Sequence, residues 1–310
     1  MSALLDVILP VFLVIGAGFL AARRGIVTDG GIDGLMAFAQ GVAVPCVLFL
    51  GLARLDLGEG FDPRLLGSFY GGSFLCFLLG VAGARLLFGR PAEDAVAIGF
   101  SALFSNSVLL GLPITERAFG PGATAGNLAI VSVHAPFCYL VGIAAMEIVR
   151  AGRAGAAAVP GKVLRGLLGN GLILGAMMGL LVNLSGLPLP PVAEEALELL
   201  ASAGIPAALF GLGGVLSRYR PEGDIPTVLF VAALSLIVHP ALTWGLGRAL
   251  ALSPDAFRSA VVTAAMAPGV NTYLFAAMYG RATRVAATSV LAGTALSVLT
   301  AAGWLSLLEG

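Results

Sequence analysis

Two segments of this 310-residue chain place polar and helix-breaking residues where long apolar runs predict continuous helices. Proline removes a backbone donor, glycine weakens a helix, and an asparagine side chain both donates and accepts hydrogen bonds without burying a charge. The pattern therefore predicts two broken helices whose polar groups contact a substrate or an ion. The candidate site residues are the amides, hydroxyls and prolines of these segments: Ser105, Asn106, Ser107, Pro113, Pro268, Asn271 and Thr272.

A broken helix exposes unpaired backbone groups and about half a unit of dipole charge at each new end. N-terminal ends offer donors to an anion, and C-terminal ends offer acceptors to a cation. Two breaks, one in each half of a membrane chain, are typical of a transporter site, and we expect Asn106 and Asn271 to line one shared cavity. The structural alternative is that both asparagines only join neighbouring helices while Pro113 and Pro268 are kinks. The paired placement favours the functional interpretation.

The composition indicates a membrane protein. The chain is 58% hydrophobic and 11% charged, with a mean hydropathy of +0.99, whereas soluble domains carry about 25% charged residues. The net charge is zero and no basic cluster suggests a nucleic acid partner. Cys46, Cys76 and Cys138 fall inside apolar runs, so we expect small buried side chains rather than disulfides or metal ligands.

A span needs about 20 apolar residues, and this spacing predicts ten spans. The first five form one repeat, residues 1–149, and the last five form a second repeat, residues 166–310, with 150–165 as a cytoplasmic linker. The fourth and ninth spans are the broken ones. The expected spans are 4–22, 32–53, 65–88, 95–119, 124–149, 166–184, 192–216, 226–250, 256–279 and 285–308.

The lysines and arginines between spans predict the orientation. With the N-terminus outside, five arginines lie on the outer side: Arg54, Arg64, Arg117, Arg248 and Arg258. Twelve basic residues then lie on the cytoplasmic side: Arg23, Arg24, Arg85, Arg90, Arg150, Arg153, Lys162, Arg165, Arg218, Arg220, Arg281 and Arg284. We therefore expect both termini on the non-cytoplasmic side of the cell (inner) membrane.

The two halves resemble each other. Residues 44–49 (VPCVLF) match 205–210 (IPAALF), and Asn106 and Asn271 are separated by nearly the same offset. Because each repeat has an odd number of spans, the second copy must insert upside down. This predicts an inverted repeat whose broken helices meet near the midplane.

Residues 106–113 (NSVLLGLP) resemble the Asn-x-x-x-Leu-Gly-x-Pro signature of the auxin efflux carrier family, which includes bacterial members. Residues 268–273 (PGVNTY) with Tyr279-Gly280 are similar to its second motif. The resemblance implies a bile-acid-transporter-like fold with two crossing broken helices. It also implies a scaffold of spans 1, 2, 6 and 7 and a transport domain of spans 3–5 and 8–10. Asn106 and Asn271 become substrate or ion contacts, and Pro113 and Pro268 the crossing points.

The paired breaks and the resemblance together imply secondary active transport of a small organic anion, and the resemblance implies an acid that is auxin-like or similar to malonate or malate. The alternatives are a receptor or sensor that uses the same pocket without transport, a channel, or a sodium-coupled symporter of the bile-acid type. An enzyme is not expected, because no mid-membrane aspartate pair or His-Glu-x-x-His zinc motif is present. The expected partners are a small organic acid and the lipid bilayer, with a homodimer as an alternative to the monomer.

Two histidines, His134 and His239, are candidates for coupling, because a membrane-embedded ionisable residue marks function and histidine titrates near neutral pH. The structural alternative is a neutral histidine bonded to a nearby carbonyl. No carboxylate occupies the expected membrane centre, which argues against a carboxylate proton relay. Coupling to H+ or to Na+ held by carbonyls and amides stays open, and no other cofactor is expected.

Overall fold

The computed structural model describes residues 2–55, 61–151, 161, 171–186, 188–219 and 224–309, and in these ranges every regular element is a helix. Six helical stretches there are long and apolar enough to cross a membrane, and two apolar helices, Val7–Arg23 and Gly171–Ser185, are shorter. Large apolar side chains are exposed on several helices, for example Leu13 at 61%, Leu181 at 62% and Leu299 at 74%. An all-helical protein with such surfaces suits a lipid environment.

The first half contains seven α-helices in the described residues: α1 (Ser2–Arg23), α2 (Asp29–Phe38), α3 (Val44–Ala53), α5 (Pro63–Leu86), α6 (Ala92–Leu103), α7 (Leu112–Phe119) and α8 (Ala125–Ala151). The second half contains α10 (Gly171–Ser185), α11 (Pro191–Leu216), α12 (Ile225–Ala233), α13 (His239–Ala249), α14 (Pro254–Ala264), α15 (Val270–Tyr279) and α16 (Thr283–Glu309). Short turns complete the described helices: η1 (Ala39–Ala43), η2 (Ser107–Gly111), η3 (Pro121–Thr124) and η5 (Leu234–Val238).

Three of the short turns, η1, η2 and η5, are π-helical, and each one is followed by a proline near the start of the next helix. The prolines are Pro45, Pro113 and Pro240. Proline cannot donate to the carbonyl four residues earlier, so the helix widens there. Next to Pro240, the indole Nε1 of Trp304 in α16 donates to the free Leu236 carbonyl over 2.9 Å. The α2–α3 and α12–α13 stretches therefore stay continuous through their prolines.

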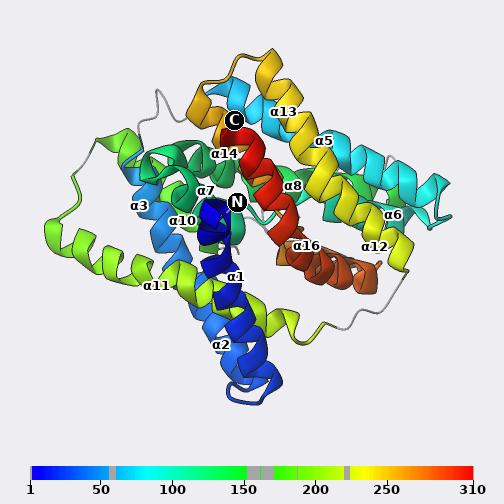
Figure 1. The fold of residues 1–310 in the computed structure, drawn as a ribbon, viewed down its shortest axis with the longest axis horizontal. Helices are drawn as coiled ribbons and strands as arrows, with labels where there is room; N and C mark the ends of the chain where they lie inside the picture. Colours follow the sequence, from blue (N-terminus) through cyan, green and yellow to red (C-terminus); the bar gives the residue numbers. More distant parts are fainter. Residues whose placement is uncertain are drawn as a thin grey trace.

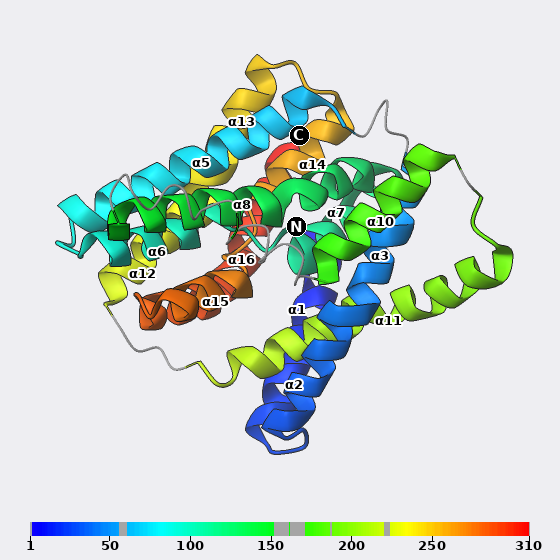
Figure 2. The ribbon, with the colours of Figure 1, turned by 180° about the vertical axis from the view of Figure 1, so that it is seen from behind.

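The helices pack in two groups (Figures 1 and 2). In the first group, α1 packs against α11, α3 packs against α10, and α2 and α3 also contact α11. In the second group, α5 contacts α6 and α13, α8 contacts α6 and α14, η2 and α7 contact α14, and α12 and α15 both contact α16. The groups meet where α1 contacts α7 and α16, and where α3 and α10 contact α8.

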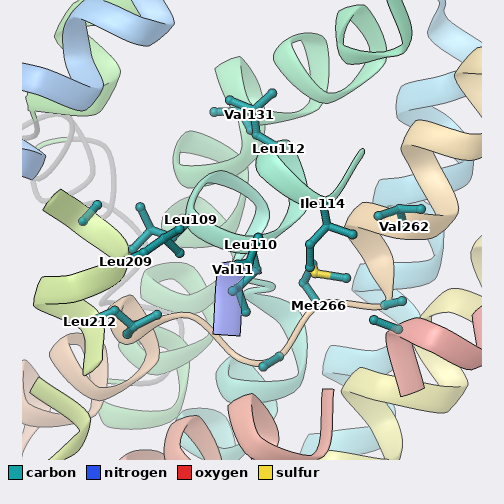
Figure 3. Packing of buried hydrophobic residues seen from close by; sticks show 14 of the residues in the cluster. Val11, Leu109, Leu110, Leu112, Ile114, Val131, Leu209, Leu212, Val262 and Met266 are labelled. Carbon is teal, nitrogen blue, oxygen red and sulfur yellow. The ribbon is translucent and has the colours of Figure 1, made fainter. Parts of the chain in front are cut away.

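The largest cluster of buried apolar side chains lies where the groups meet (Figure 3). Leu109 of η2 and Leu209 of α11 belong to this cluster, so a broken segment of the second group packs against a helix of the first. Ile114 of α7 lies beside Met266, which follows α14, in the same cluster. Residues of both broken segments are therefore part of the apolar core where the two groups meet.

Both predicted breaks are present: α6 ends at Leu103, and α14 ends at Ala264. Each half-helix is short; α6, with 12 residues, is about 18 Å long. Most of the expected linker lies outside the described residues, as do 166–170 of the expected sixth span. The same holds for four basic residues used to predict the orientation: Arg153, Lys162, Arg165 and Arg220.

Candidate functional site

The two broken segments cross each other through an isolated antiparallel β-bridge between Ser105 and Pro268. The Asn106 backbone N–H donates to the Ala267 carbonyl over 2.8 Å, and the Gly269 N–H donates to the Phe104 carbonyl over 2.9 Å. Backbone N–H and C=O groups that lose their helical partners at one break therefore form hydrogen bonds with backbone groups of the other break. This pairing fixes the two half-helices that follow, η2–α7 and α15, relative to each other.

The backbone acceptors of the first break are satisfied within the protein. The Leu103 carbonyl accepts from the Ser73 hydroxyl over 2.9 Å. The Ser105 carbonyl lies 3.1 Å from Nε2 of His134, and the Asn106 carbonyl accepts from two amides of the next turn. Acceptors are thus already occupied at this break.

Two donors of the same break are left without a partner. The Nδ2 of Asn106 and the Oγ of Ser105 are buried and form no hydrogen bond with any residue that the structure describes. Asn106 is 6% exposed and Ser105 3% exposed. An unsatisfied buried polar group costs about 1–3 kcal/mol, so it is expected to bind a ligand or an ordered water.

A cavity of about 50 Å³ lies against the crossing. Its polar lining includes Ser105, Asn106, Ser107, His134 and Asn271, and among the described residues no carboxylate, ammonium or guanidinium group lines it. The facing wall is mainly apolar and comes from α3 and α10 of the first packing group. The cavity has room for a few ordered waters in this conformation.

The starts of two half-helices face this cavity. Asn106 and Gly269 precede the first turns of η2 and α15, and both line the cavity together with Val108 and Val270. The first N–H groups of a helix have no partner within it, and the helix dipole makes this end positive. Residues 265–267, which follow the C-terminal end of α14, do not line the cavity. The C-terminal end of α6 also reaches the cavity at Phe104 and Ser105, but the Leu103, Phe104 and Ser105 carbonyls have partners in the protein. The groups left free are therefore donors that suit an anion.

Asn271 belongs to the other broken segment, in the first turn of α15, and is half-buried. Its Oδ1 accepts a hydrogen bond from the Tyr139 hydroxyl of α8 over 3.4 Å. Tyr139 did not emerge from the sequence, because an aromatic residue inside an apolar span is usually part of the core. The apolar wall from Val44 and Leu48 was missed for the same reason.

Some predicted site residues lie away from the cavity. The β-bridge places Pro268 at the crossing but not on the cavity lining. Pro113 lies beyond η2, away from the β-bridge at the crossing, and the role that the family resemblance implies for it stays a prediction. It lies in the first turn of α7, directly after the π-turn η2, where its ring removes a donor to a carbonyl of the preceding turn. Thr272 is buried, and its hydroxyl donates to the Gly269 carbonyl over 2.8 Å.

The two histidines differ in position. His134 lines the cavity, and its ring packs edge-on against Phe104 with centroids 4.6 Å apart. His239 lies outside the lining, with Nε2 3.4 Å from the Phe69 carbonyl. In each histidine Nε2 lies near a backbone carbonyl, as expected for the alternative in which a neutral histidine only forms a hydrogen bond within the protein.

Comparisons with known proteins agree with one another. The family described as "Membrane transport protein" matches residues 3–305. The chain is 24% identical to a protein of Rhizobium meliloti (strain 1021) named "Putative malonate transporter", over 100% of this chain and 97% of that protein. It is 21% identical to an "Uncharacterized transporter" of Methanothermobacter thermautotrophicus over 84% of each chain. It is also 26% identical to "Auxin efflux carrier component 4" of Arabidopsis thaliana, over 41% of this chain and 21% of that protein.

Proposed function

Because this chain belongs to the auxin efflux carrier family of membrane transport proteins, we propose that it carries a small organic anion across the membrane by alternating access at the crossing of its broken helices. The proposed substrate class is a carboxylate of the malonate or malate type, or an auxin-like acid. The likeness to the Rhizobium protein supports a dicarboxylate as the first compound to test.

The observation that carries the proposal is the imbalance between donors and acceptors at the cavity. The unpaired Asn106 Nδ2 and Ser105 Oγ, together with two half-helix N-termini, offer donors to a ligand. The carbonyls of the first break have partners in the protein. A carboxylate accepts several hydrogen bonds and complements a positive helix end, so it fits this set of groups.

We further propose ten spans arranged as an inverted repeat, with α6–α7 and α14–α15 as the crossing spans. Matching contacts between the halves support this arrangement. The α1–α11 contact corresponds to α10–α3, the α5–α6 contact to α13–α14, and the α6–α8 contact to α14–α16. The first packing group, α1–α3 with α10 and α11, is the proposed scaffold, and the second is the proposed transport domain.

The cavity between the proposed domains suggests how substrate would move. In this conformation its volume of about 50 Å³ suits a few waters, so a dicarboxylate requires the domains to separate on one side. Movement of the second group against the first would open the cavity to each side in turn, because the lining comes from both groups.

Uptake of radiolabelled malonate into proteoliposomes tests the proposal. We expect uptake that saturates with malonate concentration and is inhibited by unlabelled malate. Imposing a pH gradient or a sodium gradient in separate samples distinguishes H+ coupling, for which His134 and His239 are the candidates, from Na+ coupling. Saturable binding with no uptake under any gradient would favour a receptor, and uptake that does not saturate would favour a channel.

The proposed orientation places both termini on the non-cytoplasmic side of the cell membrane. We expect Glu195→Cys to react with a membrane-impermeant maleimide in intact cells and Arg153→Cys to react only after the cells are opened. The native cysteines Cys46, Cys76 and Cys138 are buried, so their background reaction should be small. The reverse pattern of labelling would show that the orientation is inverted.

A further inference from the structure

A second cavity, of about 270 Å³, lies at the ends of α13 and α16 and the start of α14. It is separate from the cavity at the crossing, with which it shares no lining residue. Its charged lining consists of Arg248 and Arg258, and its aromatic lining consists of Trp244 and Phe257. Cationic and aromatic side chains together at one recess suggest a site for an anionic ligand.

The guanidinium of Arg248 has no acidic partner in the part of the chain that the structure describes. Its Cζ lies 4.8 Å from the ring centroid of Phe257 and 5.4 Å from that of Trp244. The two rings pack edge to face with centroids 4.9 Å apart. The guanidinium is therefore held by aromatic rings, and its donors form no hydrogen bond with the described residues.

Arg258, unlike Arg248, has an acidic partner. It pairs with Asp255 at 3.3 Å, and its Cζ lies 4.9 Å from the Phe119 ring centroid. With this pair neutral, the cavity keeps the positive charge of Arg248.

The cavity lies where apolar spans end. The candidate span Thr283–Leu308 finishes at a lining residue, and the span Ile225–Ala249 finishes directly after the lining residue Arg248. Leu307 and Leu308 form its apolar edge, and Leu307 is 60% exposed. Tryptophan and arginine at the end of a span are typical of the headgroup level of a bilayer. A ligand here would meet cationic groups on one side and hydrocarbon on the other.

We propose that this cavity binds the phosphate group of an anionic phospholipid, with Arg248 as the main contact. A guanidinium suits phosphate because its planar donors match two phosphate oxygens and it is weakly hydrated. The apolar edge formed by Leu307 and Leu308 accommodates the start of an acyl chain, which inorganic phosphate does not have. The site does not depend on the proposed substrate, and its occupant is a component of the membrane itself.

Quenching of tryptophan fluorescence by brominated lipids tests this site. The chain has two tryptophans; Trp244 lines the cavity, and the Trp304 ring lies beside it with centroids 6.1 Å apart, so both report on a lipid bound there. In reconstituted wild-type protein, we expect brominated phosphatidylglycerol to quench severalfold more efficiently than brominated phosphatidylcholine. Arg248→Gln should abolish this preference, and Arg248→Lys should keep part of it because the charge remains.

The matched control is Arg64→Gln. Arg64 is exposed, pairs with Asp62 and lies on the same proposed side of the membrane, but does not line the cavity. This variant should keep the wild-type preference. Equal quenching by both lipids in the wild-type protein, or an unchanged preference in Arg248→Gln, would overturn the proposal. If millimolar inorganic phosphate removes the preference, the site takes soluble phosphate and the lipid assignment is wrong.

Discussion

Replacing Asn106 with leucine is expected to weaken binding of an organic anion by roughly ten- to hundredfold while the protein still folds. The change removes the unpaired Nδ2 donor at the crossing and puts an apolar group in its place. A hydrogen bond to a charged group contributes about 1.5–3 kcal/mol. Asn271→Leu should have an effect of the same direction, because Asn271 lines the same cavity. Malonate binding to purified protein by isothermal titration calorimetry measures both changes.

Folding should be less affected than binding, since the Asn106 side chain has no hydrogen bond from Nδ2 to lose. Leu48→Met is the matched control, because Leu48 lines the same cavity without a polar group and the substitution nearly conserves volume. It should leave the affinity close to the wild-type value. If monodisperse Asn106→Leu and Asn271→Leu proteins bind and carry malonate normally, the crossing is not the substrate site.

Gly18→Ala is expected to destabilise the protein by about 3 kcal/mol or to prevent its folding, because overpacking at this site cannot relax. A Cβ at Gly18 would overlap the backbone carbonyl of Phe210 in α11. A Cβ at Gly213 of α11 would overlap the carbonyl of Ile15 in the same way. Backbone atoms cannot change rotamer, so α1 and α11 would have to move apart. Thermal unfolding in detergent measures the loss.

Gly16→Ala provides the control within the same helix. A Cβ at Gly16 meets nothing within 4 Å, and alanine favours a helix over glycine by about 0.8–1.0 kcal/mol. This variant should be as stable as the wild type or slightly more stable. Equal melting temperatures for Gly18→Ala and Gly16→Ala would contradict the close contact between α1 and α11.

The sequence by itself determined the class of protein and the positions of the two helix breaks. Apolar runs of span length with few charges cannot form a soluble core of ordinary composition, so a helical membrane protein follows from composition. Proline and glycine act on the backbone locally, which is why the breaks near Asn106 and Pro268 were predictable without knowing what surrounds them. The motifs at these breaks also indicated the family.

Only the tertiary structure decided which polar groups are free to bind a ligand. Ser105, Asn106 and Asn271 reach the cavity, whereas Thr272 bonds to a carbonyl of its own turn and Pro113 lies beyond the crossing. The sequence shows that a donor is present but not whether it has a hydrogen-bond partner, because that partner comes from another helix. The cavity wall from α3 and α10, and the Arg248 recess between α13, α14 and α16, likewise arise from contacts between segments far apart in the sequence.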